Sequence, residues 1–156
     1  AEGIRMAHVL GDLHYGWLEE PVREGDFAGL AHVRATRALP IAGGERISRL
    51  QLLPELAASV DHAILDVSHL GGITQWMKAA AFLDVHNLPI STHSYCVISA
   101  QLLGAVRTAA WLEHMDWWDP LFQGALVPEQ GVVTLPETPG LGLSLHEDTV
   151  RRYLVD

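Results

Sequence analysis

Residues 62–93 read HAILDVSHLGGITQWMKAAAFLDVHNLPISTH, and they show most clearly the pattern from which the fold can be predicted. An apolar run that begins at His62 ends at Asp66, a helical pattern of apolar residues follows, and a second apolar run leads to His93. Two short apolar runs separated by one helix of about three turns are typical of parallel strands joined by a crossover helix. The stretch therefore predicts a βαβ unit.

The same unit recurs on both sides of this stretch. Apolar runs end at Glu19 and Glu45 before it and at Glu113 after it, so that five polar ends follow one another at intervals of 20 to 27 residues. Strands that alternate with helices at this interval predict a parallel sheet. The apolar periodicity predicts helices over residues 26–37, with Asp26 as the N-cap, and over residues 47–58, 74–85 and 97–106.

Such a sheet has two possible arrangements, an open doubly wound sheet and a closed (β/α) barrel. Polar residues at successive strand ends favour the barrel, because all of its carboxyl-terminal strand ends converge on one mouth. An open sheet would spread them along an edge, with one crevice at the switch point. The chain also lacks the G-x-G-x-x-G and G-x-x-x-x-G-K-[ST] patterns of dinucleotide and phosphate sites.

The composition limits the class of protein. The chain has 156 residues, of which 49% are hydrophobic, a length that suggests one domain or part of a larger one. A net charge of −9 argues against a nucleic-acid-binding surface, which needs a positive stripe. Because Cys96 is the one cysteine and no signal peptide or run of about 18 apolar residues is present, we expect a cytoplasmic protein that does not enter a membrane.

Five polar side chains at the expected strand ends form the candidate site: Glu19, Glu45, Asp66, His93 and Glu113. Each alone is more often a solvated loop residue or a structural residue, but five in one phase indicate a shared site. Glu19 and Glu45 are hard oxygen ligands that suit Mg²⁺. Asp66 beside His93 would fix the imidazole tautomer and make a better base. We expect Glu113 to stay protonated near a substrate carboxylate and to donate a hydrogen bond to developing negative charge.

The motifs around these residues carry a family resemblance. In order and spacing, over essentially the whole chain, they resemble the mandelate-racemase-like subgroup of the enolase superfamily, in the mandelate racemase/muconate lactonizing enzyme family. The matching motifs are Trp17-Leu18-Glu19-Glu20-Pro21, Pro40-Ile41-Ala42-Gly43-Gly44-Glu45, Asp66-x-x-x-x-Gly71-Gly72-Ile73-Thr74, Pro89-x-x-x-His93, Trp111-Leu112-Glu113 and Pro139-Gly140-Leu141-Gly142.

The resemblance implies a fold and a set of roles. The fold would be the C-terminal portion of a TIM-like (β/α) barrel, without the N-terminal capping domain and the first strands. Glu19 and Glu45 would be ligands of Mg²⁺, Asp66 and His93 the acid/base dyad, and Glu113 a contact of the substrate carboxylate or the enediolate. Members of the family also have a third metal ligand, an aspartate, and a lysine-bearing strand, both of which would fall before Ala1. We therefore expect a chain that is incomplete by itself, with the N-terminal half as a separate chain or the sequence as a truncated piece.

The function expected from these residues is Mg²⁺-assisted removal of the α-proton of a carboxylate to give an enediolate. We favour an acid-sugar dehydratase, a lyase, over a racemase or epimerase of a 2-hydroxy acid, an isomerase. A different class stays open, an inactive half-barrel that needs a partner chain. The expected partners are a small carboxylate substrate, the N-terminal half of the enzyme and further copies in a homo-oligomer, but neither nucleic acid nor membrane.

The remaining expectations concern organisation and packing. We expect the partial barrel over residues 1–135 and a linker and helix that leave the barrel over residues 136–156, with a short strand at 132–135 and the helix at 148–154. Trp76 and Trp111 lie at apolar positions and are expected in the core, whereas Tyr95 and His69 could reach the mouth.

Overall fold

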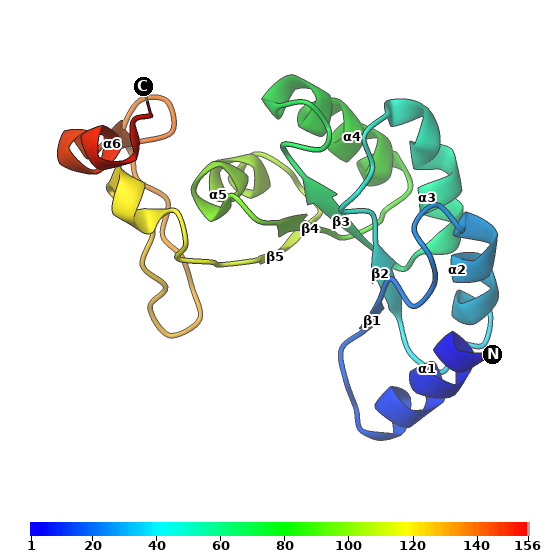
Figure 1. Ribbon diagram of the computed structural model, residues 1–156. Coiled ribbons are helices and arrows are strands. Elements are labelled where there is room, and N and C mark those ends of the chain that lie inside the picture. The colour runs from blue at the N-terminus through cyan, green and yellow to red at the C-terminus, as the bar shows by residue number, and fades with distance from the viewer. Residues whose placement is uncertain (156) are drawn as a thin grey trace.

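The computed structural model describes residues 1–155 and contains a five-stranded parallel sheet (Figure 1). The strands lie in sequence order, each paired with the next in the chain, as the alternating pattern predicted. Their bounds are β1 (Leu18–Glu19), β2 (Ile41–Gly43), β3 (His62–Asp66), β4 (Ile90–His93) and β5 (Ala109–Leu112). Every strand therefore presents its carboxyl end at the same edge of the sheet.

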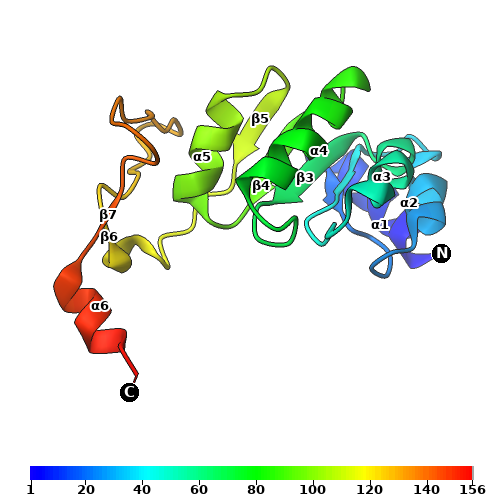
Figure 2. The same ribbon diagram turned by 90° about the horizontal axis from the view of Figure 1, so that it is seen from above.

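Helices connect the strands and lie along one face of the sheet (Figures 1 and 2). The predicted N-cap is confirmed, since the Asp26 carboxylate accepts a hydrogen bond from the Gly29 amide at 2.8 Å. The second predicted helix is shorter than expected, because residues 47–49 are not helical and a 3₁₀ turn precedes the α-helix. The elements are α1 (Glu2–Asp12), α2 (Phe27–Arg34), η1 (Leu50–Leu52), α3 (Leu53–Ser59), α4 (Ile73–Val85) and α5 (Cys96–Gly104).

The core lies between the central strands and these helices. All five residues of β3 are buried, and this strand pairs with β2 on one edge and β4 on the other. Leu56 from α3 and Trp76 from α4 pack against it with no exposed surface, and each such side chain contributes about 1.5–3 kcal/mol to folding. The prediction of a buried Trp76 is confirmed. The same prediction for Trp111 is wrong, because β5 pairs on one side only and leaves this side chain 62% exposed.

The chain beyond β5 leaves the sheet and runs to the helix α6 (Glu147–Tyr153), which stands apart in both views (Figures 1 and 2). It contains η2 (Asp119–Leu121) and an antiparallel pair of β6 (Phe122–Gln123) and β7 (Ser144–Leu145). The strand predicted at 132–135 is wrong: Val132 makes an isolated bridge to Glu129, and no strand includes it. The boundary at residue 135 stays a prediction, and the β6–β7 pair joins residues from both sides of it.

A second, smaller apolar cluster joins this segment to α5. Leu126 is buried against Cys96, Val97 and Ala100, with Leu135 packed alongside. The Cys96 thiol is 2% exposed and donates a hydrogen bond to the Met115 carbonyl at 3.3 Å. Across residues 1–155, no helix combines the length and the apolar character that crossing a bilayer requires.

Candidate active site at the carboxyl edge of the sheet

The five predicted site residues follow the five strands in order along one edge of the sheet. Glu19, Asp66 and His93 are the last residues of β1, β3 and β4, and Glu113 comes directly after β5. Glu45 lies two residues beyond β2, past a turn in which Gly44 adopts a φ of 120°. The parallel arrangement thus brings together side chains that are far apart in the sequence.

Asp66 and His93 form the best-defined contact of the site. They are direct register partners at the ends of β3 and β4, and Nδ1 of His93 lies 2.7 Å from Oδ2 of Asp66. The predicted contact is therefore confirmed. Because an ionised carboxylate only accepts hydrogen bonds, Nδ1 carries the proton and Nε2 keeps a free lone pair. Asp66 therefore holds His93 in the tautomer that can accept a proton at Nε2.

The other carboxylate oxygen of Asp66 holds the loop that follows β3. Oδ1 accepts hydrogen bonds from the amide and hydroxyl of Ser68, at 2.6 and 2.7 Å, and from the amide of His69 at 2.8 Å. Burial alone would raise the pKa of Asp66, but these bonds and the bond to His93 lower the pKa below its ordinary value. Asp66 is therefore an anion fixed at both oxygens, and only 2% of it is exposed.

His93 stands between carboxylates. Its Nε2 lies 3.6 Å from Oε2 of Glu45 and 3.5 Å from the Ser94 hydroxyl. Burial alone would lower the pKa of His93, but the hydrogen bond to Asp66 and the negative charges of Glu45, Glu113 and Asp66 outweigh it and raise the pKa. The imidazole is thus basic, partly exposed and directed toward Glu45, where a substrate proton could reach it.

Glu19 and Glu45 form the predicted metal-ligand pair. Loss of solvation raises the pKa of Glu19, the hydrogen bond from Trp17 Nε1 at 3.4 Å lowers it, and the negative charges of Glu45 and Glu113 raise it again, with a net increase. Carboxylates whose negative charges raise one another's pKa are an environment that a divalent cation stabilises. Within residues 1–155, no group of three or more His, Cys, Asp or Glu side chains is arranged to hold a metal ion. That Glu19 and Glu45 act as two ligands of a larger coordination sphere therefore stays a prediction.

Glu113 is fixed by a strained turn. Its Oε2 accepts a hydrogen bond from the Ser94 amide at 2.7 Å, which leaves Oε1 available to a ligand. Ser94 and Tyr95 have φ angles of 52° and 43°, a left-handed conformation that costs non-glycine residues about 1–3 kcal/mol each. The buried Ser99 hydroxyl stabilises the turn by donating to the Ser94 carbonyl at 2.9 Å. An unfavourable backbone conformation thus places the Ser94 amide where it can donate to Glu113.

Several supporting contacts of the site have a weak signal or no signal in the sequence. The Asp66-x-Ser68 spacing is a signal for the turn in which a carboxylate accepts from the second residue on, and it could have identified Ser68. The role of the Ser94 amide depends on a left-handed φ angle at a serine, for which the sequence carries no signal. Trp17 stands in the sequence only as part of the motif Trp17-Leu18-Glu19-Glu20-Pro21, which does not show its hydrogen bond to Glu19.

The sequence left open that Tyr95 and His69 could reach the mouth. The Tyr95 ring stacks on Trp118 at a centroid distance of 6.1 Å and an angle of 11°. His69 instead lies at the site, because its Nδ1 is 2.8 Å from the Glu45 carbonyl and its ring is stacked near His93.

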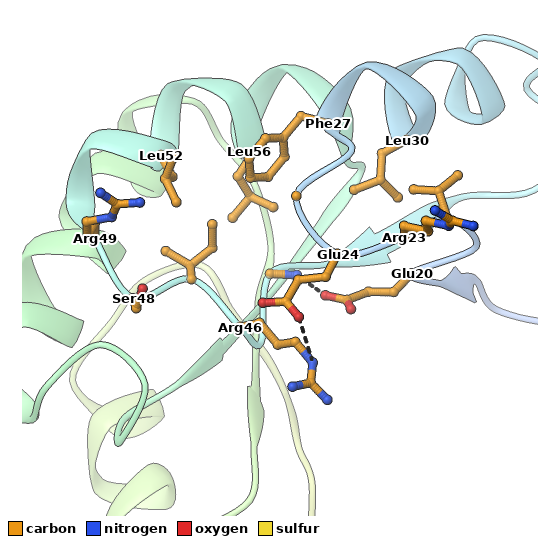
Figure 3. Close-up of a pocket in the computed structure, with 14 residues that line it drawn as sticks. Glu20, Arg23, Glu24, Phe27, Leu30, Arg46, Ser48, Arg49, Leu52 and Leu56 are labelled. Atoms are coloured by element: carbon orange, nitrogen blue, oxygen red, sulfur yellow. Dashed lines mark hydrogen bonds and ion pairs between the residues drawn. The ribbon is translucent and has the colours of Figure 1, made fainter.

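A separate cavity of about 320 Å³ lies beside the site, between the loops that follow β1 and β2 (Figure 3). Figure 3 shows Leu52, Leu56 and Phe27 on its apolar side and Arg46 on its charged side. The Arg46 guanidinium lies 4.0 Å from Glu24 in the cavity and 3.6 Å from Oε1 of Glu45 in the site. Arg46 therefore separates the cavity from the metal-ligand pair.

Comparison with known proteins places this geometry in a family. A family model described as enolase C-terminal domain-like matches residues 1–149. The D-xylonate dehydratase of Haloferax volcanii is 30% identical over an alignment 166 residues long, gaps included. The alignment covers 97% of this chain and 40% of that enzyme. A solved enolase from alpha pretobacterium bal199 with bound Mg is 33% identical, with a TM-score of 0.91, and covers 99% of this chain and 43% of its own. A Bradyrhizobium enolase complexed with magnesium and mandelic acid is 32% identical, with a TM-score of 0.90 and the same coverage.

These matches agree with the parallel sheet of the chain. The chain spans about two fifths of the length of the relatives that it matches. Its parallel sheet corresponds to the C-terminal barrel half of enolase-superfamily structures, so the predicted partial barrel is confirmed. The chain belongs to the enolase C-terminal domain-like family of the enolase superfamily.

Proposed function

We propose that this chain supplies the acid–base side of an active site that removes the α-proton of a carboxylate substrate, and that the overall reaction is the dehydration of an acid sugar. One observation carries the proposal. The imidazole of His93 is held at Nδ1 by Asp66 at 2.7 Å, while Nε2 faces the metal-ligand residue Glu45 at 3.6 Å. A base fixed beside a cation site is suited to an acid whose carboxylate binds that cation.

The residues present fit Mg²⁺. Glu19 and Glu45 offer hard carboxylate oxygens, and the raised pKa of Glu19 reflects a partly desolvated carboxylate among neighbouring negative charges. When bound, Mg²⁺ supplies a positive charge that stabilises negative charge developing on a substrate carboxylate. A third ligand, a second base and a capping domain would come from the rest of the enzyme.

The residues of this chain account for the proton and the electrons. Nε2 of His93 accepts the α-proton, and the electron pair of the C–H bond moves into the carboxylate to give an enediolate. Asp66 stabilises the resulting imidazolium through Oδ2, and Oε1 of Glu113 is free to contact the enediolate. If a β-hydroxyl is present, His93 returns the proton to it as it leaves as water, and the enol product becomes a 2-keto acid.

The comparisons support dehydration as the first candidate, since the D-xylonate dehydratase of Haloferax volcanii is among the relatives. The bound mandelic acid of the Bradyrhizobium enolase supports a second candidate, racemisation of a 2-hydroxy acid. Racemisation needs a second base on the opposite face of the α-carbon. The two reactions share the proton transfer to His93 and differ in the fate of the enediolate.

The test uses the complete enzyme that contains this chain, a panel of acid sugars and 2-hydroxy acids that includes D-xylonate and mandelate, and solvent D₂O. We expect Mg²⁺-dependent incorporation of deuterium at the α-carbon or release of a 2-keto acid, measured by NMR. His93→Asn should keep the fold and the Mg²⁺ affinity and should lower α-proton removal at this face by at least about a hundredfold.

The matched control is His86→Asn, which changes an exposed histidine directly after α4. This variant should react at the wild-type rate. If His93→Asn also exchanges and turns over at the wild-type rate, His93 is a packed structural residue and the proposal is wrong.

A further inference from the structure

His69 touches three of the residues assigned above to chemistry. Its ring Nδ1 lies 2.8 Å from the Glu45 carbonyl, and its backbone amide donates to Oδ1 of Asp66 at 2.8 Å. Its ring is also nearly parallel to that of His93, at an angle of 13° and a centroid distance of 6.4 Å. This separation lies within the range of about 4.5–7 Å that is usual for stacked aromatic rings.

These contacts close a ring of four residues. From Glu45 the path runs to His69 at 2.8 Å, from His69 to Asp66 at 2.8 Å, from Asp66 to His93 at 2.7 Å, and from His93 back to Glu45 at 3.6 Å. The four residues come from the loops or ends of three successive strands. The His69 side chain is the only link that joins the loop after β3 to the loop after β2 within this ring.

The geometry points to His69 as a positioning residue that sets the metal ligand Glu45 relative to the base His93. This inference rests on the function proposed above and goes beyond it. It requires no protonation change at His69, because a carbonyl oxygen only accepts hydrogen bonds and Nδ1 must therefore carry a proton. The bond instead fixes the peptide of Glu45, which lies beyond the end of β2 and directly after Gly44 with its φ of 120°.

A residue in this role should control the affinity of the metal rather than the stability of the fold. His69 is exposed at the surface, so its truncation leaves no cavity in the core. Its backbone bond to Asp66 survives any substitution, and the Asp66–His93 pair should keep its geometry. What is lost is the anchor of Glu45, and partners that orient metal ligands typically affect metal affinity by about 10–100-fold.

Three variants of the complete enzyme separate the contacts. His69→Asn keeps an amide donor close to the position of Nδ1 but removes the ring, His69→Phe keeps a stacking ring but removes the donor, and His69→Ala removes both. Calorimetric titration with MgCl₂ in the absence of substrate measures the metal affinity directly. We expect His69→Ala and His69→Phe to weaken Mg²⁺ binding about tenfold, and His69→Asn to restore most of the affinity, with thermal midpoints close to that of the wild type.

His86→Ala is the matched control, because it truncates an exposed histidine at the opposite end of the same crossover. At saturating Mg²⁺, the α-proton exchange of His69→Ala should recover toward the wild-type rate, which a general structural defect would not allow. Wild-type Mg²⁺ affinity in both His69→Ala and His69→Phe would overturn the inference. Failure of the wild-type enzyme to exchange any α-proton would instead refute the proposed function and leave the metal-binding result interpretable.

Discussion

At the scale of single residues, the two carboxylate oxygens of Asp66 bind different hydrogen-bond donors and have different roles in the site. Oδ1 organises the loop that carries Ser68 and His69, and Oδ2 orients His93. A carboxylate can accept at both oxygens, whereas an amide must present a donor on one side. The loop offers N–H and O–H donors, so an amide at this position would turn its NH₂ group toward His93.

This difference makes Asp66→Asn informative. The amide donor would require Nδ1 of His93 to accept, so the proton would move to Nε2 and the lone pair that acts as base would be lost. We expect the α-proton exchange rate of the complete enzyme to fall by about 10²–10⁴-fold, with a residual rate and an unchanged fold. Deuterium incorporation measures the loss, and a rate within twofold of the wild type would contradict the assigned orientation.

A second prediction at this scale concerns the buried histidine His62, which is 9% exposed. Its Nε2 lies 2.6 Å from the Ser91 hydroxyl, and its ring is stacked on Trp17. Burial lowers the pKa of His62 below 6.5 in the folded state. Below about pH 6.5 the unfolded chain therefore binds a proton that the folded chain resists, and the free energy of unfolding decreases as the pH falls toward the folded-state pKa. His62→Gln should lack this part of the pH dependence in denaturant titrations between pH 7.5 and 5.5. Parallel curves for the two proteins would contradict it.

The site residues could be predicted from the sequence because they end apolar runs at a regular interval, and strand ends of a parallel sheet share an edge. The contact of Asp66 with His93 followed from their places on adjacent strands. The hydrogen bond from Ser94 to Glu113 could not be predicted, because it depends on two consecutive left-handed residues. Trp111 was misplaced for a related reason, since an apolar residue on a strand does not reveal whether a neighbouring strand covers it.

At the scale of elements, the strands and crossover helices of the sheet were predictable and the carboxyl-terminal segment was not. Buried strands such as β3 carry continuous apolar runs, and tertiary packing reinforces the local preference. Val132 and Val133 have the same local preference for strand, but no partner strand extends beside them and a single bridge forms. Strand formation requires a partner, which the local sequence does not encode.

The loop between β2 and η1 gives an element-scale prediction. A Cβ at Gly44 would lie 2.8 Å from a Leu56 side-chain carbon and 3.0 Å from the Ile64 carbonyl oxygen, at a φ of 120°. Gly44→Ala should therefore push the loop away from α3 and β3, lower the stability by about 1–3 kcal/mol and weaken Mg²⁺ binding through the displaced Glu45. Thermal unfolding and MgCl₂ titration measure the two effects.

Gly71→Ala is the control for backbone strain alone. Gly71 also has a positive φ, of 85°, but a Cβ there would meet no atom within 4 Å. The control should lose less stability than Gly44→Ala. Equal losses in the two variants would show that strain rather than the steric contact sets the effect.

At the scale of the whole molecule, the sheet has two edges, since β1 and β5 each pair on one side only. Trp111 on β5 is 62% exposed, and Trp117 just beyond it is 70% exposed. Unpaired edges and exposed aromatic side chains promote association between chains. If residues 1–156 are produced alone, we expect oligomers or aggregates in size-exclusion chromatography with light scattering. The complete enzyme provides the comparison, and a monodisperse monomer that unfolds cooperatively from these residues alone would contradict the prediction.

The buried thiol of Cys96 can report local opening of the structure around the start of α5. Cys96 begins α5, three residues after His93, and burial raises the pKa of its thiol. A thiol reagent reacts with the exposed thiolate, so modification must wait until the start of α5 separates from its neighbours. Because the sequence contains one cysteine, every modified molecule reports the same event. The rate of thiol modification therefore reports how often the segment next to the base His93 opens. This rate can be measured without any substrate.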